Sequence, residues 1–254
     1  MTYFVREDSI VRQIWGKSDT ILFIFAGGAA EFALNKAVDW LYFTGKLPAD
    51  PIGRLLSTVA YARVIVFSEE ELALKAIDTM AKIHTKVEEK RGDKIPDWAY
   101  RDVLFMLIDY SIRSYELLER KLSEAEKEEV FDVFNRVGAR MGLKGLPENF
   151  QKWLKMRDEH LNKNLVQSKY TKDLYDQYKK HLGTARYKLI LEAQILVIPD
   201  VVRKLLGLRK ISGLKPAVPM YKLSKFLKLD SILKEALLPP KYKADLKKLD
   251  RADK

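Results

Sequence analysis

The stretch that decides the fold runs from Ser68 to Gly92 and has the sequence SEEELALKAIDTMAKIHTKVEEKRG. Ser68 and Glu71 have the spacing of a capping box and Gly92 suits the end of a helix, so the stretch predicts one helix between them. Its apolar residues recur three or four positions apart, as on an amphipathic helix; they are Ala73, Ala76, Ile77, Met80 and Val87. His84 lies within this stripe.

Helix signals of the same kind follow on both sides, and the chain has no sustained apolar and polar alternation that would predict strands. Pro96 and Asp97 begin a predicted helix to about residue 121, and Ser123 with Glu126 repeats the capping box. Further helices are predicted for residues 18–43, 51–66, 148–165, 171–182 and 184–206, the last interrupted by Pro199. The longest apolar run, residues 21–34, contains Glu31 and is shorter than the roughly 20 residues of a membrane span, which predicts a buried helix.

The composition favours one all-α globular domain over residues 1–208. The chain has 254 residues, 47% of them hydrophobic, which is enough for a large core. It has no cysteine, which excludes a thiolate nucleophile, disulfides and any zinc or iron–sulfur site built on sulfur. The first residues do not resemble a secretory signal. We therefore expect an intracellular, cytoplasmic protein.

Residues 209–254 form a basic C-terminal extension rich in lysine and proline. The net charge of the whole chain is +11, which favours anionic partners. Residues 221–229, YKLSKFLKL, interleave lysine with apolar residues, so the tail either makes a peripheral contact with an anionic membrane or packs on the domain as a strap. The chain carries no recognised nucleic-acid-binding motif, and no specific nucleic-acid partner is expected.

A histidine on an apolar stripe needs a partner for its ring nitrogens, and two kinds are open for His84. One is a core group: a backbone carbonyl, Tyr61 or Tyr110. The other is a metal. Zinc or non-haem iron would need further ligands at helical spacing, which His160 and His181 do not provide. Haem needs one protein ligand, and the small side chains of Ala73, Ala76 and Ala81 suit a flat macrocycle. Taken alone, these residues favour the core group.

Several segments, taken in order, resemble the MpaB-like oxygenase family, which includes the latex-clearing rubber oxygenases. They lie between residues 20 and 208 and are DPIGRL at 50–55 with Thr58, IHTKV at 83–87, Tyr100 with Asp102, Leu122 and Ser123 with Glu126, Leu146 with Pro147, and IPDVVR at 198–203 with LGL at 206–208. The resemblance implies an all-helical fold that encloses a pocket for b-type haem. It implies His84 as the proximal iron ligand, and Arg54 and Thr58 as catalytic and haem-contacting residues. Ile77, Met80, Ala81 and Val87 would then line the haem.

Three positions depart from the family pattern. Rubber-cleaving members have a lysine immediately before the threonine, able to cap the iron, where this chain has Ser57. Many members carry Ala-His-Pro near residues 33–35 and Trp-Val-His near 108–110, where this chain has Ala-Leu-Asn and Ile-Asp-Tyr. The distal side of the pocket is therefore expected to be built differently.

Together these features predict a haem b-dependent oxygenase that uses dioxygen on a hydrophobic, unsaturated substrate. Residues 21–25, 105–107 and 189–197 are candidates for an apolar substrate channel. The alternative is a non-catalytic helical protein that keeps the fold and binds haem, a membrane or a partner. In that case Arg54 would form an exposed salt bridge and Thr58 would be a helix-internal hydroxyl. The sequence leaves the oligomeric state open.

Overall fold

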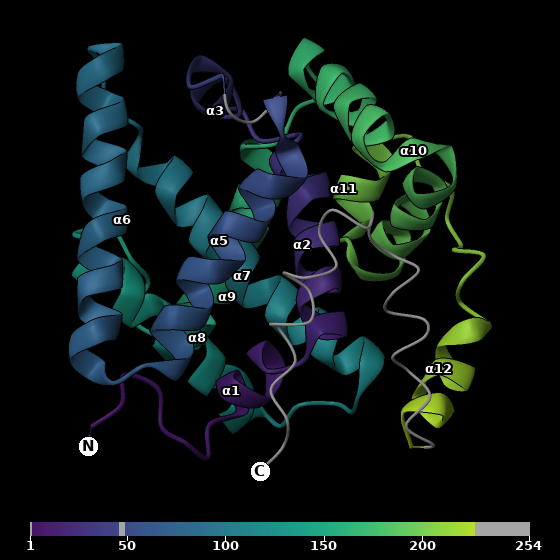
Figure 1. Ribbon diagram of the computed structural model, residues 1–254, viewed down its shortest axis with the longest axis horizontal. Helices are drawn as coiled ribbons and strands as arrows, with labels where there is room; N and C mark the ends of the chain where they lie inside the picture. The colour runs from purple at the N-terminus through teal and green to yellow at the C-terminus, as the bar shows by residue number, and fades with distance from the viewer. Residues whose placement is uncertain (1, 46–48, 227–254) are drawn as a thin grey trace.

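A computed structural model describes residues 2–45 and 49–226, and within these ranges the chain forms helices and no β-strand (Figure 1). The predicted all-α fold is confirmed. The helices are α1 (Ile10–Trp15), α2 (Ser18–Phe32), α3 (Asp39–Phe43), α5 (Pro51–Phe67), α6 (Glu70–Arg91), α7 (Asp97–Leu118), α8 (Glu124–Arg140), α9 (Phe150–Lys163), α10 (Lys169–Val197), α11 (Asp200–Leu205) and α12 (Ala217–Phe226).

The central helix is α2, which packs along α7 and also contacts α10 and α1 (Figure 1). Its apolar residues face neighbours on several sides, which explains why residues 21–34 show little polar character. The approach of α2 to α7 is very close at Gly27, where an added Cβ atom would lie 2.4 Å from the ring of Tyr110. Glycine is therefore required for these two helices to meet at this distance.

The prediction of one helix over residues 18–43 is wrong, because α2 ends at Phe32 and α3 begins only at Asp39. Asn35 makes the break. Its side-chain oxygen accepts from the backbone N–H of Ala37 at 2.8 Å and its amide donates to Asp102 at 3.2 Å. The backbone also pairs with the loop after α9, since Val166 N–H donates to the carbonyl of Leu34 at 2.7 Å. These bonds replace those that a continuing helix would have made.

The capping box predicted at Ser68 is also wrong. The residue before α6 is Glu69, and it makes no side-chain capping bond. Instead the backbone N–H of Glu70 donates to the carbonyl of Thr2 at 2.9 Å, and Tyr3 forms an isolated β-bridge with Glu69. The N-terminal segment thus satisfies a helix end that the local sequence was expected to satisfy.

Other helix boundaries agree with the sequence signals. Pro51 occupies the first turn of α5, and Ser123 and Glu126 form a complete capping box at α8. The predicted helices over residues 171–182 and 184–206 correspond to α10, which is broken at Gly183 (φ 73°, ψ 164°), and to α11, which follows Pro199. Gly92 ends α6 in the left-handed conformation.

The basic extension is described only as far as residue 226. In α12 the hydroxyl of Tyr221 donates to Asp19 at 2.9 Å, and the ammonium of Lys222 donates to the carbonyl of Glu119 at 3.0 Å. Residues 227–229 of the segment predicted to contact a membrane lie outside the described residues. The division of the chain at residue 208 stays a prediction. Among the described helices, none combines the length and apolar character of a membrane span.

Candidate functional site

Arg54 and Thr58 lie one turn apart on α5, as their spacing predicts. The guanidinium of Arg54 donates to the hydroxyls of Ser57 and Thr58, both at 3.1 Å, and both hydroxyls donate to the carbonyl of Arg54. Among the described residues Arg54 makes no ion pair, so the expected exposed salt bridge is absent there. Burial lowers the pKa of Arg54. The result is a half-buried cation held in place by two hydroxyls.

His84 lies on α6 within the electrostatic reach of Arg54. Its side chain is half-buried, and its Nδ1 atom is buried with no hydrogen-bond partner. Burial, together with the positive charge of Arg54, lowers the pKa of His84, and the nearby carboxylate of Glu88 opposes this shift. The imidazole is therefore neutral at pH 7, which is the form that binds metals.

The partners expected for a core histidine are not those that the structure provides. The ring of His84 packs edge-on against Tyr100, with centroids 5.2 Å apart. The hydroxyl of Tyr100 donates to Glu88 at 3.0 Å, and that of Tyr110 donates to Glu31 at 2.7 Å. Neither tyrosine hydroxyl thus bonds to the buried Nδ1 atom of His84, which stays unsatisfied.

The other predicted cofactor residues divide between two parts of the core. Ile77 is fully buried in the main core, and Met80 packs at the edge of it. Val87 packs instead on a separate small cluster formed by Ala37, Trp40 and Ala99. Ala81 is half-buried. His84 consequently lies between two apolar clusters along α6.

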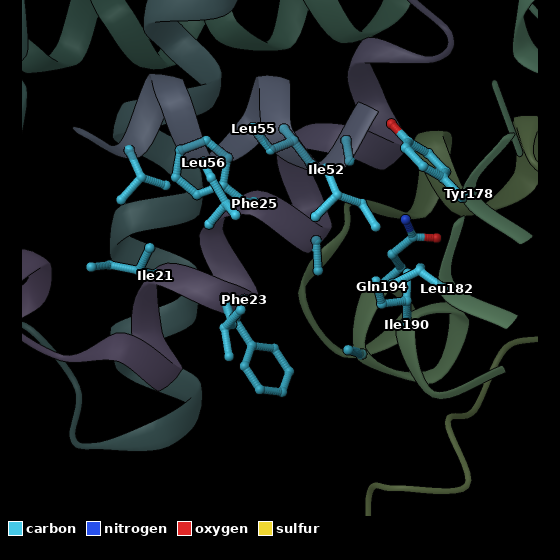
Figure 2. Close-up of a pocket in the computed structure, with 15 residues that line it drawn as sticks. Ile21, Phe23, Phe25, Ile52, Leu55, Leu56, Tyr178, Leu182, Ile190 and Gln194 are labelled. Carbon is cyan, nitrogen blue, oxygen red and sulfur yellow. The ribbon is translucent and has the colours of Figure 1, made fainter. Parts of the chain in front are cut away.

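A separate apolar cavity of about 90 Å³ lies between α2, α5 and α10 (Figure 2). Its walls include Ile21, Leu22, Phe23 and Phe25 from α2, and Ile190, Ala193 and Gln194 from α10. Two of the three predicted channel segments therefore line it. Residues 105–107 do not, because Phe105 is buried against Trp153 elsewhere in the core.

Helix α5 is shared by the cavity and by the His84 region. Ile52, Leu55, Leu56 and Val59 face the cavity, and their spacings of three, one and three place them on one side of the helix. Arg54 and Thr58 lie on another side and do not line the cavity. One helix thus connects the cation and hydroxyls beside His84 with the apolar space.

The order of these residues along one all-helical chain has a counterpart among known proteins. The family model described as ER-bound oxygenase mpaB/B'/Rubber oxygenase, catalytic domain, matches residues 13–228. The chain belongs to this family. The comparison with curated proteins and the comparison with solved structures each gave no match.

In this member of the mpaB/rubber oxygenase family, two of the three departures from the family pattern fall on buried segments. Leu34 and Tyr110 are both fully buried, whereas Ser57 is exposed and bonded to Arg54. Tyr110 and its neighbour Asp109 contribute to a buried charged cluster that we call the Glu31 cluster. It is formed by Glu31, Asp102, Asp109, Arg157 and His160.

The Glu31 cluster joins α2, α7 and α9. Arg157 holds both oxygens of Glu31, at 2.5 and 2.7 Å, and also donates to Asp109 at 2.8 Å. His160 lies 2.7 Å from Glu31 through Nε2 and 2.7 Å from Asp102 through Nδ1. Both ring nitrogens of His160 therefore face carboxylates. Among the described residues no group of three or more histidines and carboxylates is arranged to hold a metal ion.

The sequence did not predict this cluster, and it showed His160 only as a histidine without neighbours that could complete a metal site. One signal was present: Glu31 is a single carboxylate inside a long apolar run, and a buried charge requires a partner. The partners of Glu31 lie 79 to 129 positions away, so no local pattern identifies them. Gln194 lies within the predicted channel segment 189–197, but the sequence did not indicate that its amide would face the cavity.

Proposed function

We propose that this protein is a haem b-dependent oxygenase that acts on a hydrophobic, unsaturated substrate, with His84 as the proximal iron ligand. The observation that carries the proposal is the neutral imidazole of His84 beside Arg54, whose buried Nδ1 atom has no hydrogen-bond partner. Membership in an oxygenase family supports the reaction class. A single imidazole is sufficient for haem because the porphyrin supplies the other four nitrogens.

The donor set at this position suits haem. His84 would hold the iron through an unprotonated ring nitrogen. Arg54, whose guanidinium bonds to the neutral hydroxyls of Ser57 and Thr58, would pair with a propionate. Thr58 would add a hydroxyl, while Ile77, Met80, Ala81 and Val87 would supply apolar contacts along α6. When bound, haem would supply the site that activates dioxygen for transfer to the substrate.

The residues of the chain would bind the substrate and exclude water from it. The cavity between α2, α5 and α10 is almost wholly apolar, which favours a hydrocarbon-like molecule. Ser57 cannot supply the amine that caps the iron in rubber-cleaving relatives. With Ser57 in that place, a substrate other than rubber is favoured.

The decisive experiment is a visible spectrum of protein purified from cells supplied with a haem precursor. We expect a Soret band in the wild type and its loss in His84→Gly, with partial recovery when imidazole is added to fill the space. His181→Gly is the matched control and should keep the band. Colourless wild-type protein that also fails to take up added hemin would reject the proposal and favour the non-catalytic alternative.

A further inference from the structure

The wall of the apolar cavity contains one polar side chain whose hydrogen bonds are incomplete. Gln194 is fully buried, and its Oε1 atom accepts a hydrogen bond from the hydroxyl of Tyr175 at 3.0 Å. Its Nε2 atom is buried and has no partner. A buried amide donor without a partner is costly to the fold, and such groups are uncommon unless a ligand satisfies them.

The rest of the lining is apolar apart from Tyr178. Figure 2 shows the amide nitrogen of Gln194 directed toward Ile52 and the ring of Tyr178, whose hydroxyl lies at the far end of that ring. No lysine, arginine, aspartate or glutamate lines the cavity. Apart from the Tyr178 hydroxyl, the polar character of the site is therefore concentrated in the NH2 group of Gln194.

The size of the cavity limits the ligand. With about 90 Å³ and 10–15 Å³ for each water-sized group, it holds roughly six to nine such groups. That number corresponds to a small ligand, such as a short length of aliphatic chain. The lining from α2, α5 and α10 surrounds such a chain with apolar contacts (Figure 2).

From these observations we infer that the cavity binds an aliphatic chain carrying one neutral oxygen, a hydroxyl or a carbonyl, which accepts a hydrogen bond from Gln194. A carboxylate is disfavoured because no cation lines the cavity to offset its burial. Calling this ligand the substrate rests on the proposed oxygenase function. The binding itself requires only the cavity and the amide.

The test compares four six-carbon ligands, namely hexane, 2-hexanone, 1-hexanol and hexanoate, in NMR titrations of the wild type and of Gln194→Met. Methionine keeps the length of the side chain and a weak acceptor for Tyr175 but removes the donor. We expect the variant to bind 2-hexanone and 1-hexanol with about tenfold lower affinity than the wild type, whereas its affinity for hexane changes little. We expect hexanoate to bind most weakly of the three oxygen-bearing ligands.

Two matched variants separate this role from a general effect on the fold. Gln151→Met makes the same change at an exposed position on α9 and should alter no affinity. Tyr175→Phe removes the hydroxyl that bonds to the Gln194 oxygen and keeps the N–H donor of Gln194. The variant should therefore still bind 2-hexanone more tightly than hexane. Equal loss of hexane and 2-hexanone affinity in Gln194→Met would overturn the inference.

A measurement on the wild type alone keeps the inference testable if Gln194→Met does not fold. The side-chain amide protons of Gln194 should shift on binding of 2-hexanone and not on binding of hexane. Absence of that shift at saturation would also overturn the inference. Because these titrations need no haem, colourless protein that still shows the shift would reject the proposed function and leave this site standing.

Discussion

At the scale of the residue, two serines with the same predicted role differ in what the fold gives them. Ser123 accepts from the backbone N–H of Glu126 at 3.2 Å, and Glu126 accepts from the backbone N–H of Ser123 at 2.8 Å. Ser68 precedes an equally suitable glutamate, yet the helix end that it was expected to cap is bonded by Thr2. Capping residues in a sequence therefore locate a helix more reliably than they identify the group that completes it.

This difference gives a pair of stability predictions. Ser123→Ala should lower the free energy of unfolding by about 1 kcal/mol, because it removes a side-chain cap. Ser68→Ala should change it by less than about 0.5 kcal/mol, because no capping bond is lost. Urea denaturation followed by circular dichroism measures both. An equal loss in the two variants would contradict the assignment of caps.

At the scale of the element, the contact between α2 and α7 depends on which of two adjacent glycines faces the neighbour. A Cβ atom on Gly27 would lie 2.4 Å from the ring of Tyr110, which is fully buried and has no free space to move into. A Cβ atom on Gly28 would meet nothing within 4 Å. The GG pair in the sequence does not distinguish these positions.

We expect opposite effects from the two alanine substitutions. Gly27→Ala should destabilise the protein by about 1–3 kcal/mol, because α2 and α7 must separate or Tyr110 must leave Glu31. Gly28→Ala should stabilise it by up to about 1 kcal/mol through helix propensity. Thermal and urea unfolding of the two variants would show the contrast, and destabilisation by Gly28→Ala would argue against this helix packing.

At the scale of the whole molecule, the Glu31 cluster fastens α2, α7 and α9 to one another by charge. Arg157 and His160 hold the pKa of Glu31 at about 2, below its ordinary value of 4.5, despite complete burial. Glu31 and Asp102 in turn raise the pKa of His160 above its ordinary 6.5. Glu31 therefore stays ionised in the folded protein at neutral pH.

The pKa shift of Glu31 predicts acid sensitivity. A lowered folded-state pKa contributes stability that is fully present above pH 4.5 and is lost as the pH falls toward 2. The free energy of unfolding of the wild type should decrease across that window. The raised pKa of His160 acts oppositely, contributing fully below pH 6.5 and losing its contribution as the pH rises through the folded-state value.

Glu31→Gln provides the matching variant. It should cost up to about 3–5 kcal/mol at neutral pH, because Arg157 and His160 each lose one of the two carboxylates that hold them and keep only Asp109 and Asp102. Its unfolding free energy should also fall less between pH 4.5 and 2 than that of the wild type. Glu159→Gln, at an exposed position on α9, is the control and should change stability by less than about 0.5 kcal/mol. If the unfolding free energy of Glu31→Gln decreased between pH 4.5 and 2 as much as that of the wild type, this role for the cluster would be excluded.

The sequence by itself determined the features that depend on neighbouring residues. Helix periodicity, Pro51, Gly92, the Ser123 box and the breaks at Gly183 and Pro199 are local, and they defined the all-α fold and most helix boundaries. The ordered motifs around Arg54, Thr58 and His84 indicated the family in the same way.

Only the tertiary structure decided which distant groups meet. It ended α2 at Phe32 through bonds to residues 164–166, surrounded Glu31 with Arg157 and His160, and left the amide nitrogen of Gln194 without a partner in an apolar cavity. The physical reason is that buried polar groups must be satisfied by whatever the packing brings near them, and such partners are separated by many positions in the chain.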